Sequence, residues 1–464
     1  MDIDTRRTNE TRDRHFERIR ELLDHYRRGA QTIVLLPGGM GSQLDVSTAT
    51  FPADGDAPPT GWDAAWLSLG VLFKRSLEGL VISPNGHDED EHLAIANGEI
   101  RGVYAPYDAT RACLEAAGRN YIVFGFDWRR SLGEAASHLE WFLAQLKACV
   151  LERYAEDPLP GVTLLGHSQG GLVLKVFFHR LFPDDASAQR AGDWFERAIC
   201  VGTPFYGTCN HMQRYYLGES ALNLVYGTSR VAGLTASLPA PYVLMFPSQA
   251  TYRAVGAKAG LSSYPVLDES GAPADPYDPA QTHRFPRWVR PEYLSAAART
   301  GSLLARPLPA PLIPRVFNFR SVVETGTPQE LIWSVEDGAS FQPLGVRAPV
   351  RVEKTGPGDT TVPSWSGRLV DVPDDQVADL QQADDHVTLL QHGETLATLV
   401  HLLNTGELPE GISGAHGEQL PPRAPDHELN AFLLRAKAGA LDPREMANVP
   451  VGIVRKFFEA GRLC

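Results

Sequence analysis

The stretch Thr163–Gly171, TLLGHSQGG, decides the fold class of this chain. An apolar run ends just before it, as at the end of a buried strand, and the segment after it has helical spacing. Ser168 therefore lies on a very short turn between a strand and a helix, flanked by Gly166 and Gly170 in the layout G-x-S-x-G. Glycines are expected there because side chains would collide with the neighbouring strand and helix. The layout predicts a nucleophilic serine, and the alternative is a turn serine that caps the helix.

Length, charge and cysteine content narrow the class of protein. The chain has 464 residues, 43 basic and 56 acidic, with a net charge of -13. This balance argues against a nucleic-acid partner and against electrostatic docking on anionic lipid. The five cysteines are scattered without a C-x-x-C motif, so we expect neither a disulfide framework nor a metal site, and no cofactor. No apolar signal segment or membrane-length run is present, which predicts a cytoplasmic protein.

Strands and helices alternate along the first half of the chain. Strands are predicted at Thr32–Leu36, within 120–130, at 162–165 and at Ala198–Val201, and helices at 9–28, 62–73 and 134–155. The first helix is expected to pack on the core, with a membrane-surface helix as the alternative. This alternation around the Ser168 turn predicts an α/β fold with a mostly parallel central sheet.

The second half of the chain is interrupted by a segment rich in Pro, Tyr, Gly and Ala. Late strands are predicted in RVFNFRSVV, ELIWSV, APVRVEK and RLVDV, followed by a helical run in HVTLLQHGETLATLVHLLN. We therefore divide the chain into an N-terminal helix (1–30), a core in two parts (31–208 and 313–404), an inserted cap or lid (209–312) and a C-terminal helical extension (405–464). The cap is expected to supply apolar residues to an acyl pocket, namely Leu222, Leu224, Val225, Tyr242, Leu244 and Phe246.

A serine nucleophile needs a base, and the base needs an acid to orient it. In proteins with this turn the order along the chain is serine, acid, histidine, with each residue in a loop after a strand. Three histidines fit that order: His386, His392 and His416. His386 is favoured because it lies at the entrance to the last apolar helix, whereas His392 lies within or across it.

The acid is predicted in the loop TGPGDTTVPSWSG. Asp359 follows the apolar run 350–352 and is flanked by glycine. The alternative is an aspartate that only shapes an Asx-turn. The competing carboxylates lie in a denser acidic stretch or beside His386, where they are expected to be solvated or to cap a helix. They are Asp371, Asp374, Asp375, Asp384 and Asp385.

Two backbone N–H groups should stabilise the negative oxygen that forms during attack. One belongs to Gln169, the residue after the serine, and the other to a loop after an early strand. The segment PGGMGSQ fits that loop, with Gly38 and Gly39 allowing close approach of the backbone. It lacks the spacing of a phosphate-binding or a dinucleotide-binding loop.

Seven segments in order resemble the lecithin:cholesterol acyltransferase and lysosomal phospholipase A2 family of α/β-hydrolases. They are IVLLPGGMGSQL, WLSLGVLFKRSLEGLVIS, FGFDWRR, LLGHSQGGLVLKVFF, VGTPFYGT, GPGDTTVPSWS and DDHVTLLQ. The resemblance implies an α/β-hydrolase fold with Ser168 as nucleophile, Asp359 as acid and His386 as base. It also implies Gly39 and Gln169 at the oxyanion hole, and substrate contacts from Met40, Trp62 and Trp66.

The chain departs from this family in three ways. No signal peptide is expected from its N-terminal segment, it lacks the family's cysteine near Trp62, and it has Gly39 where members often carry a larger residue. We therefore expect a serine hydrolase of acyl esters, lipid or lipid-like, with at most weak membrane association. An acyltransferase using an alcohol acceptor is the alternative, and a non-catalytic binding protein of the same fold is the second. The sequence leaves the oligomeric state open.

Overall fold

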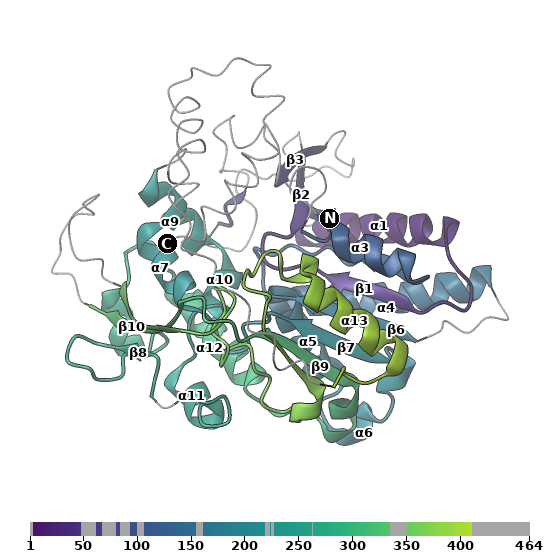
Figure 1. The fold of residues 1–464 in the computed structure, drawn as a ribbon. Coiled ribbons are helices and arrows are strands. Elements are labelled where there is room, and N and C mark those ends of the chain that lie inside the picture. Colours follow the sequence, from purple (N-terminus) through teal and green to yellow (C-terminus); the bar gives the residue numbers. More distant parts are fainter. Residues whose placement is uncertain are drawn as a thin grey trace, which may run out of the picture.

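A sheet of six parallel strands forms the centre of the part of the chain that the structure describes (Figure 1). This structure is a computed structural model, and it describes residues 3–47, 62–66, 80–83, 93–99, 106–154, 161–218, 223, 227–261, 263–334 and 350–410. The strand order is β12-β9-β7-β6-β1-β5. The strands are β1 (Thr32–Leu36), β5 (Asn120–Val123), β6 (Val162–His167), β7 (Arg197–Val201), β9 (Val316–Ser321) and β12 (Val377–Leu380). The mostly parallel α/β sheet predicted from the sequence is thus confirmed.

Alternate residues of each strand face opposite layers of helices. On β1, Val34 and Leu36 belong to the core shared with α1 (Ile3–Asp24), α4 (Leu132–Arg153) and α5 (Gln169–Leu181). Ile33 and Leu35 pack on the other side, with residues of α3 (Asp108–Ala116) and α13 (Gly393–Thr405). Because both faces are covered, the middle of β1 is a continuous apolar run, as is usual for parallel strands in α/β proteins.

The segment between β7 and β9 holds most of the short helices. They are α7 (Cys209–Leu217), α9 (Thr228–Ser237), α10 (Pro239–Val243), α11 (Gln249–Val255), η4 (Pro279–Arg284), α12 (Pro291–Leu304) and η5 (Ala310–Arg315). This segment also contributes β8 (Val266–Leu267) to a small sheet of order β11-β10-β8 with β10 (Thr327–Trp333) and β11 (Val350–Gly356). The inserted segment therefore shares a small sheet with the residues that follow β9.

The prediction of a helix over residues 62–73 is wrong for its first five residues, 62–66. Trp62–Trp66 forms β3, which pairs antiparallel with β2 (Ser42–Ser47), and β2 pairs on its other side with β4 (Ala94–Glu99). The two tryptophans are four residues apart, and that spacing fits one face of a strand as well as one face of a helix. Residues 67–73 lie outside the described residues.

Of the remaining late strand predictions, two are confirmed as strands and one is wrong. The described residues of ELIWSV and APVRVEK contribute to β10 and β11, which belong to the small sheet rather than the central one. RLVDV (368–372) is not a strand, and the last strand of the central sheet is β12. Leu369 is buried as a strand residue would be, but its N–H donates to the side chain of Asn318 (2.9 Å) rather than to a neighbouring strand.

The helical run predicted from residue 386 begins later. A single 3₁₀ turn, η7 (Leu389–Gln391), precedes α13. The segment before that turn is a loop that carries His386. Residues 411–464, which include His416 and most of the predicted C-terminal extension, lie outside the described residues. Among the helices that are described, none combines the length and the apolar character needed to cross a membrane.

Candidate active site

Ser168 lies on a strained turn between β6 and α5. Its backbone has φ 51° and ψ −119°, a left-handed conformation that costs a non-glycine residue energy. The turn is held by the Ser168 N–H, which donates to the Val201 carbonyl at 2.9 Å. A Cβ at Gly170 would lie 2.2 Å from the Leu36 carbonyl oxygen, so only glycine fits there. The serine hydroxyl does not cap α5, which excludes the capping alternative.

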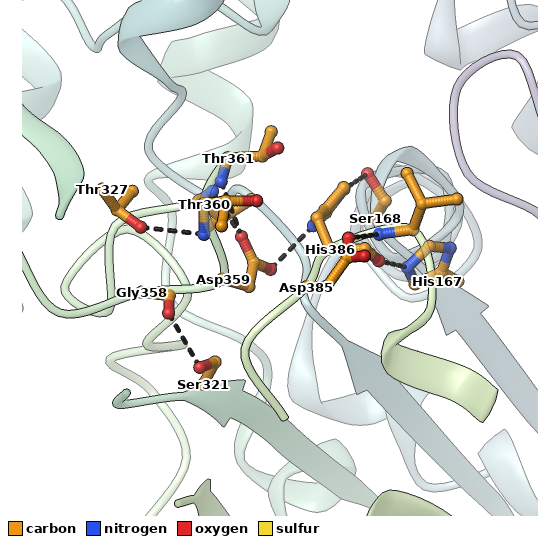
Figure 2. A network of polar contacts seen from close by, with 12 residues as sticks. His167, Ser168, Ser321, Thr327, Gly358, Asp359, Thr360, Thr361, Asp385 and His386 are labelled. Atoms are coloured by element: carbon orange, nitrogen blue, oxygen red, sulfur yellow. Dashed lines mark hydrogen bonds and ion pairs between the residues drawn. The ribbon is translucent and has the colours of Figure 1, made fainter. Parts of the chain in front are cut away.

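The structure brings together the three residues that the sequence singled out (Figure 2). Ser168 Oγ lies 2.8 Å from His386 Nε2, and His386 Nδ1 lies 2.7 Å from Asp359 Oδ2. All three side chains are buried, with 9 % of Ser168, 8 % of His386 and 1 % of Asp359 exposed. A carboxylate, an imidazole and a hydroxyl thus form one line of hydrogen bonds, in which the imidazole can accept the serine proton.

The loop of Asp359 is fixed by the central sheet, although it follows β11 of the small sheet. The Gly358 carbonyl accepts a hydrogen bond from Ser321 Oγ (2.9 Å) at the end of β9, and the Gly358 N–H donates to Val323 (2.8 Å). This anchoring places the carboxylate at the same sheet edge as Ser168. The sequence placed Asp359 at a strand end, but the strand whose end supports it is β9 rather than the one that precedes it.

The two carboxylate oxygens of Asp359 have different partners. Oδ1 accepts from the backbone N–H groups of Thr361 (3.1 Å) and Val362 (2.6 Å), as in an Asx-turn. Oδ2 faces His386. The turn therefore fixes the carboxylate in the orientation that the imidazole needs.

The other candidate residues have structural partners. His392 is the N-cap of α13 and accepts the Glu394 N–H at 3.3 Å, so it is not inside the helix as predicted. Asp371 forms a buried ion pair with Lys175 (3.1 Å), and therefore is not solvated. The remaining acidic residues are partly or fully exposed, namely Asp374, Asp375, Asp384 and Asp385.

The glycine-rich loop after β1 forms a tight turn beside Ser168. The Gly41 N–H donates to the Gly38 carbonyl (3.0 Å), and Met40, at the third position, has φ 63°, as in a type II turn. Gly39 is exposed, whereas Gly38 is buried. A Cβ on Gly38 would come within 3.1 Å of Ser168 Cβ, so the turn lies directly against the serine.

Gln169 occupies the space beside Gly39. A Cβ on Gly39 would lie 2.8 Å from Gln169 Oε1, while Gln169 Nε2 donates to the Trp128 carbonyl at 3.1 Å. Glycine at position 39 therefore makes room for the glutamine. The same bond to Trp128 fixes the orientation of the first residue of α5.

The predicted substrate-contact residues lie at different places around this turn. Met40 is part of it and is half-buried. Trp66 pairs in register with Leu44, close to the turn, whereas Trp62 pairs with Ser47 at the other end of β2. The Arg14 guanidinium of α1 lies 5.8 Å from the centre of the Trp62 ring. Of the two tryptophans, Trp66 is therefore the nearer to the turn.

Two buried residues that sequence reasoning missed contact the site. His167 Nε2 lies 3.0 Å from the His386 carbonyl, and His167 Nδ1 lies 3.0 Å from the Tyr107 hydroxyl. Burial, reinforced by His386, lowers the pKa of His167 to about 3. His167 precedes Ser168, and so it does not fit the order serine, acid, histidine from which a base is predicted. Tyr107 directly precedes α3 and belongs to no recognisable motif, so the sequence alone does not indicate that it contacts the site.

One titratable residue of the inserted segment, His211 of α7, is buried and influenced by the charge of His386. Its pKa is held well below the ordinary value by burial, by Arg214 and by His386. Its Nδ1 lies 2.8 Å from Thr208 Oγ1. The predicted pocket residues Tyr242 and Phe246 are fully buried and pack against other aromatic rings. Leu244 is also buried, and Leu222, Leu224 and Val225 lie outside the described residues.

Within the described part of the chain, no group of three or more His, Cys, Asp or Glu side chains is arranged to hold a metal ion. The polar side chains aligned with the Ser168 hydroxyl are the imidazole of His386 and, behind it, the carboxylate of Asp359. This arrangement can activate a hydroxyl.

Comparison with known proteins agrees with this fold. The model of the lecithin:cholesterol acyltransferase family matches residues 112–266, about a third of the chain, which includes Ser168 and the first helices of the inserted segment. Among solved structures, one chain of the crystal structure of the Tle4-Tli4 complex superposes with a TM-score of 0.52 at 14% identity, over 81% of this chain and 98% of that chain. The search of curated proteins gave no match. The chain is thus an α/β-hydrolase-fold protein whose residues 112–266 match the lecithin:cholesterol acyltransferase family.

Proposed function

We propose that this protein cleaves acyl esters through a covalent acyl-enzyme formed on Ser168. The observation that carries the proposal is the line of hydrogen bonds from Ser168 Oγ to His386 Nε2 and from His386 Nδ1 to Asp359 Oδ2. A serine hydroxyl is a weak nucleophile at neutral pH, and a hydrogen-bonded imidazole makes it a strong one by accepting its proton. The family match of the segment that holds Ser168 favours acyl esters as the substrate class.

In the first step, Ser168 Oγ attacks the ester carbonyl while its proton passes to His386 Nε2. Asp359 keeps the imidazole in the tautomer that has a proton on Nδ1, and it stabilises the imidazolium that forms. The protonated His386 then gives its proton to the leaving alcohol, and the acyl group stays on Ser168. In the second step, water attacks the acyl-enzyme with the same proton transfers, and the acid is released.

The negative oxygen of each tetrahedral intermediate would lie between two backbone N–H groups, those of Gly39 and Gln169. Gln169 is the first residue of the 13-residue helix α5, so its N–H also carries the positive end of the helix dipole. Gly39 is exposed at the turn that packs against Ser168. The fixed side chain of Gln169 keeps both donors in place without reorganisation during the reaction.

Whether water or an alcohol accepts the acyl group from Ser168 is a separate question. An alcohol in place of water would make the protein an acyltransferase, and the family match of residues 112–266 favours testing this. The acyl donor is proposed to be lipid-like, with Met40 and Trp66 as contacts beside the turn. The net charge of -13 means that contact with a lipid surface depends on apolar burial, so we expect only weak membrane association.

The test uses a fluorophosphonate probe and p-nitrophenyl butyrate. We expect the native protein to be labelled at Ser168 and to hydrolyse the ester, and Ser168→Ala to lose both, with a rate loss of at least about a thousandfold. Ser137→Ala is the matched control, because Ser137 is a half-buried serine on α4 whose hydroxyl donates to the Gly133 carbonyl of the same helix. Folding of each variant is checked by circular dichroism.

Adding an alcohol acceptor separates the two fates of the acyl group. Appearance of the alkyl ester at the expense of free acid would assign acyl transfer, and free acid alone would assign hydrolysis. A folded Ser168→Ala protein that turned over the ester at the native rate would remove Ser168 as the nucleophile. A native protein that neither reacts with the probe nor hydrolyses any acyl ester would point to the non-catalytic alternative.

A further inference from the structure

A chain of buried hydrogen bonds connects the backbone of His386 to the glycine-rich turn on the opposite side of Ser168. His167 Nε2 lies 3.0 Å from the His386 carbonyl oxygen, and His167 Nδ1 lies 3.0 Å from the Tyr107 hydroxyl. The Tyr107 hydroxyl in turn accepts the Gly38 N–H at 2.8 Å. Tyr107 is 2 % exposed and His167 is 4 % exposed, so water does not compete for these groups.

The partners fix the direction of every bond in this chain. A carbonyl oxygen can only accept, so His167 Nε2 carries a proton and donates to His386. Burial lowers the pKa of His167 to about 3, so the ring is neutral and Nδ1 is an acceptor. The Tyr107 O–H therefore donates to Nδ1, and its oxygen is left to accept the Gly38 N–H. The donor and acceptor roles are therefore fixed for four groups: the His386 carbonyl, the His167 ring, the Tyr107 hydroxyl and the Gly38 N–H.

This chain of hydrogen bonds holds the two parts of the site that must keep a fixed geometry, the backbone of His386 and the glycine-rich turn. At one end it holds the backbone of His386, whose own N–H donates to the Asp359 carbonyl at 2.9 Å. At the other end it holds Gly38, the first residue of the turn that presents Gly39. Between them, His167 is the residue that directly precedes Ser168. The oxyanion turn and the base are thereby tied to the same strand end, β6.

We propose that Tyr107 and His167 are positioning residues that set the oxyanion turn and the general base at a fixed distance from Ser168. This inference rests on the proposed function, because it gives a role to the turn only if an oxyanion forms beside Ser168. Tyr107 accepts the Gly38 N–H, so in this proposal the N–H of the next residue, Gly39, is the one left to bind the reacting oxygen. Neither side chain touches the substrate, so their effect belongs to the transition state rather than to substrate binding.

Tyr107→Phe is the first test, because it removes one oxygen and leaves the ring in place. We expect kcat for p-nitrophenyl butyrate to fall on the order of 10- to 100-fold, with KM within about threefold of the native value. A trifluoromethyl ketone adds to the serine and places an oxyanion in the same hole. Its inhibition constant should rise by a factor similar to the loss in kcat. A merely structural loss would not move these two quantities together.

The matched control is Tyr154→Phe. The Tyr154 hydroxyl is also hydrogen-bonded, but it donates to the backbone carbonyl of Leu23 (3.2 Å) in α1. Tyr154 directly follows the C-terminal end of α4, so this bond touches neither the glycine-rich turn nor His386. Kinetics of this variant should match the native protein.

His167→Gln supplies a second variant, including for the case in which Tyr107→Phe does not fold. The glutamine amide can still donate to the His386 carbonyl, but it removes the acceptor for Tyr107. We expect a similar loss in kcat, and the double variant should lose no more than the worse single variant because both changes break one chain.

The inference is overturned if folded Tyr107→Phe and His167→Gln keep kcat and ketone affinity within about twofold of native. It is also overturned if the loss appears only in KM, or if Tyr154→Phe loses as much. Each of these results can occur while Ser168→Ala is inactive and native labelling is intact, so the proposed function would survive. Full activity of Ser168→Ala would instead overturn the proposed function itself.

Discussion

Asp359 and His386 are tied to each other twice, once through side chains and once through backbone. Asp359 Oδ2 lies 2.7 Å from His386 Nδ1, and the His386 N–H donates to the Asp359 carbonyl at 2.9 Å. The residues also enclose Gly202, which has φ 56° and whose added Cβ would lie 3.3 Å from Asp359 Oδ2 and 3.5 Å from His386 Nδ1. The Asp359 carboxylate and the His386 imidazole are therefore held together at the end of β7.

Asp359→Asn is predicted to reduce activity more than the loss of one charge suggests. The backbone N–H groups of Thr361 and Val362 require an acceptor at the Oδ1 position, so the asparagine must place its NH₂ group toward His386. His386 Nδ1 then becomes an acceptor, and the ring proton moves to Nε2, where it faces Ser168. We expect a loss in kcat on the order of 10³- to 10⁴-fold with a nearly unchanged melting temperature. Retention of a tenth or more of the native kcat would contradict this tautomer argument.

His386→Ala and His392→Ala form a pair that tests the choice of base. The two histidines are six residues apart, but only His386 contacts Ser168. His386→Ala should lose activity by at least about a thousandfold. His392→Ala should keep it, and should lose only the cap of α13, about 0.5–1 kcal/mol of unfolding free energy. Ester hydrolysis and urea unfolding of both variants measure the two effects. Activity that is lost in His392→Ala and kept in His386→Ala would show that His392, not His386, is the base.

The fold could be read from sequence because it depends on local patterns. Runs such as Thr32–Leu36 and Ala198–Val201 are apolar on both faces, and that requires strands covered by helices on both sides. The turn at Ser168 needs small neighbours, which the sequence displays directly. The pattern was ambiguous at Trp62 and Trp66, where a spacing of four residues fits two periodicities.

The contacts around the site depend on tertiary partners that no local pattern reveals. Asp359 could be predicted as a candidate because of its glycine-flanked loop, but its support by Ser321 depends on packing between distant strands. Tyr107 is 60 residues from His167 in sequence, and only the position of α3 brings them together. Asp371 was expected to be solvated because its neighbours are acidic, whereas burial against α5 gives it Lys175 as a partner.

The buried pair of Lys175 and Asp371 gives a stability prediction that is separate from catalysis. Lys175 Nζ lies 3.1 Å from Asp371 Oδ2, with side chains 2 % and 7 % exposed. Burial lowers the pKa of Lys175, and the attraction of Asp371 opposes this. Lys175→Met should leave an uncompensated buried carboxylate and cost about 3–5 kcal/mol, whereas Lys175→Met with Asp371→Leu should recover most of that loss. Urea unfolding of the single and double variants measures this, and a single variant as stable as the native protein would refute it.

Buried neutral histidines should make the protein unstable in mild acid. His15 stacks on Phe124 with ring centres 4.8 Å apart, and burial, with His138 and Arg18 nearby, lowers its pKa to about 3. In the unfolded chain the same ring has a pKa of about 6.5, so below that pH the unfolded state binds a proton that the folded state does not. The stability that a neutral His15 provides is therefore complete above about pH 6.5, and it falls as the pH decreases toward the folded value.

The size of this effect can be measured with one substitution. Between pH 7 and pH 5, each fully buried neutral histidine should lower the free energy of unfolding by about 2 kcal/mol. His15→Phe keeps an aromatic ring against Phe124 and removes the titrating group, so the loss between these two pH values should shrink by about that amount. Urea unfolding at pH 7 and pH 5 gives both free energies, and His283→Phe, at an exposed position, is the control that should leave the difference unchanged. An unchanged pH dependence in His15→Phe would mean that His15 is protonated in the folded protein.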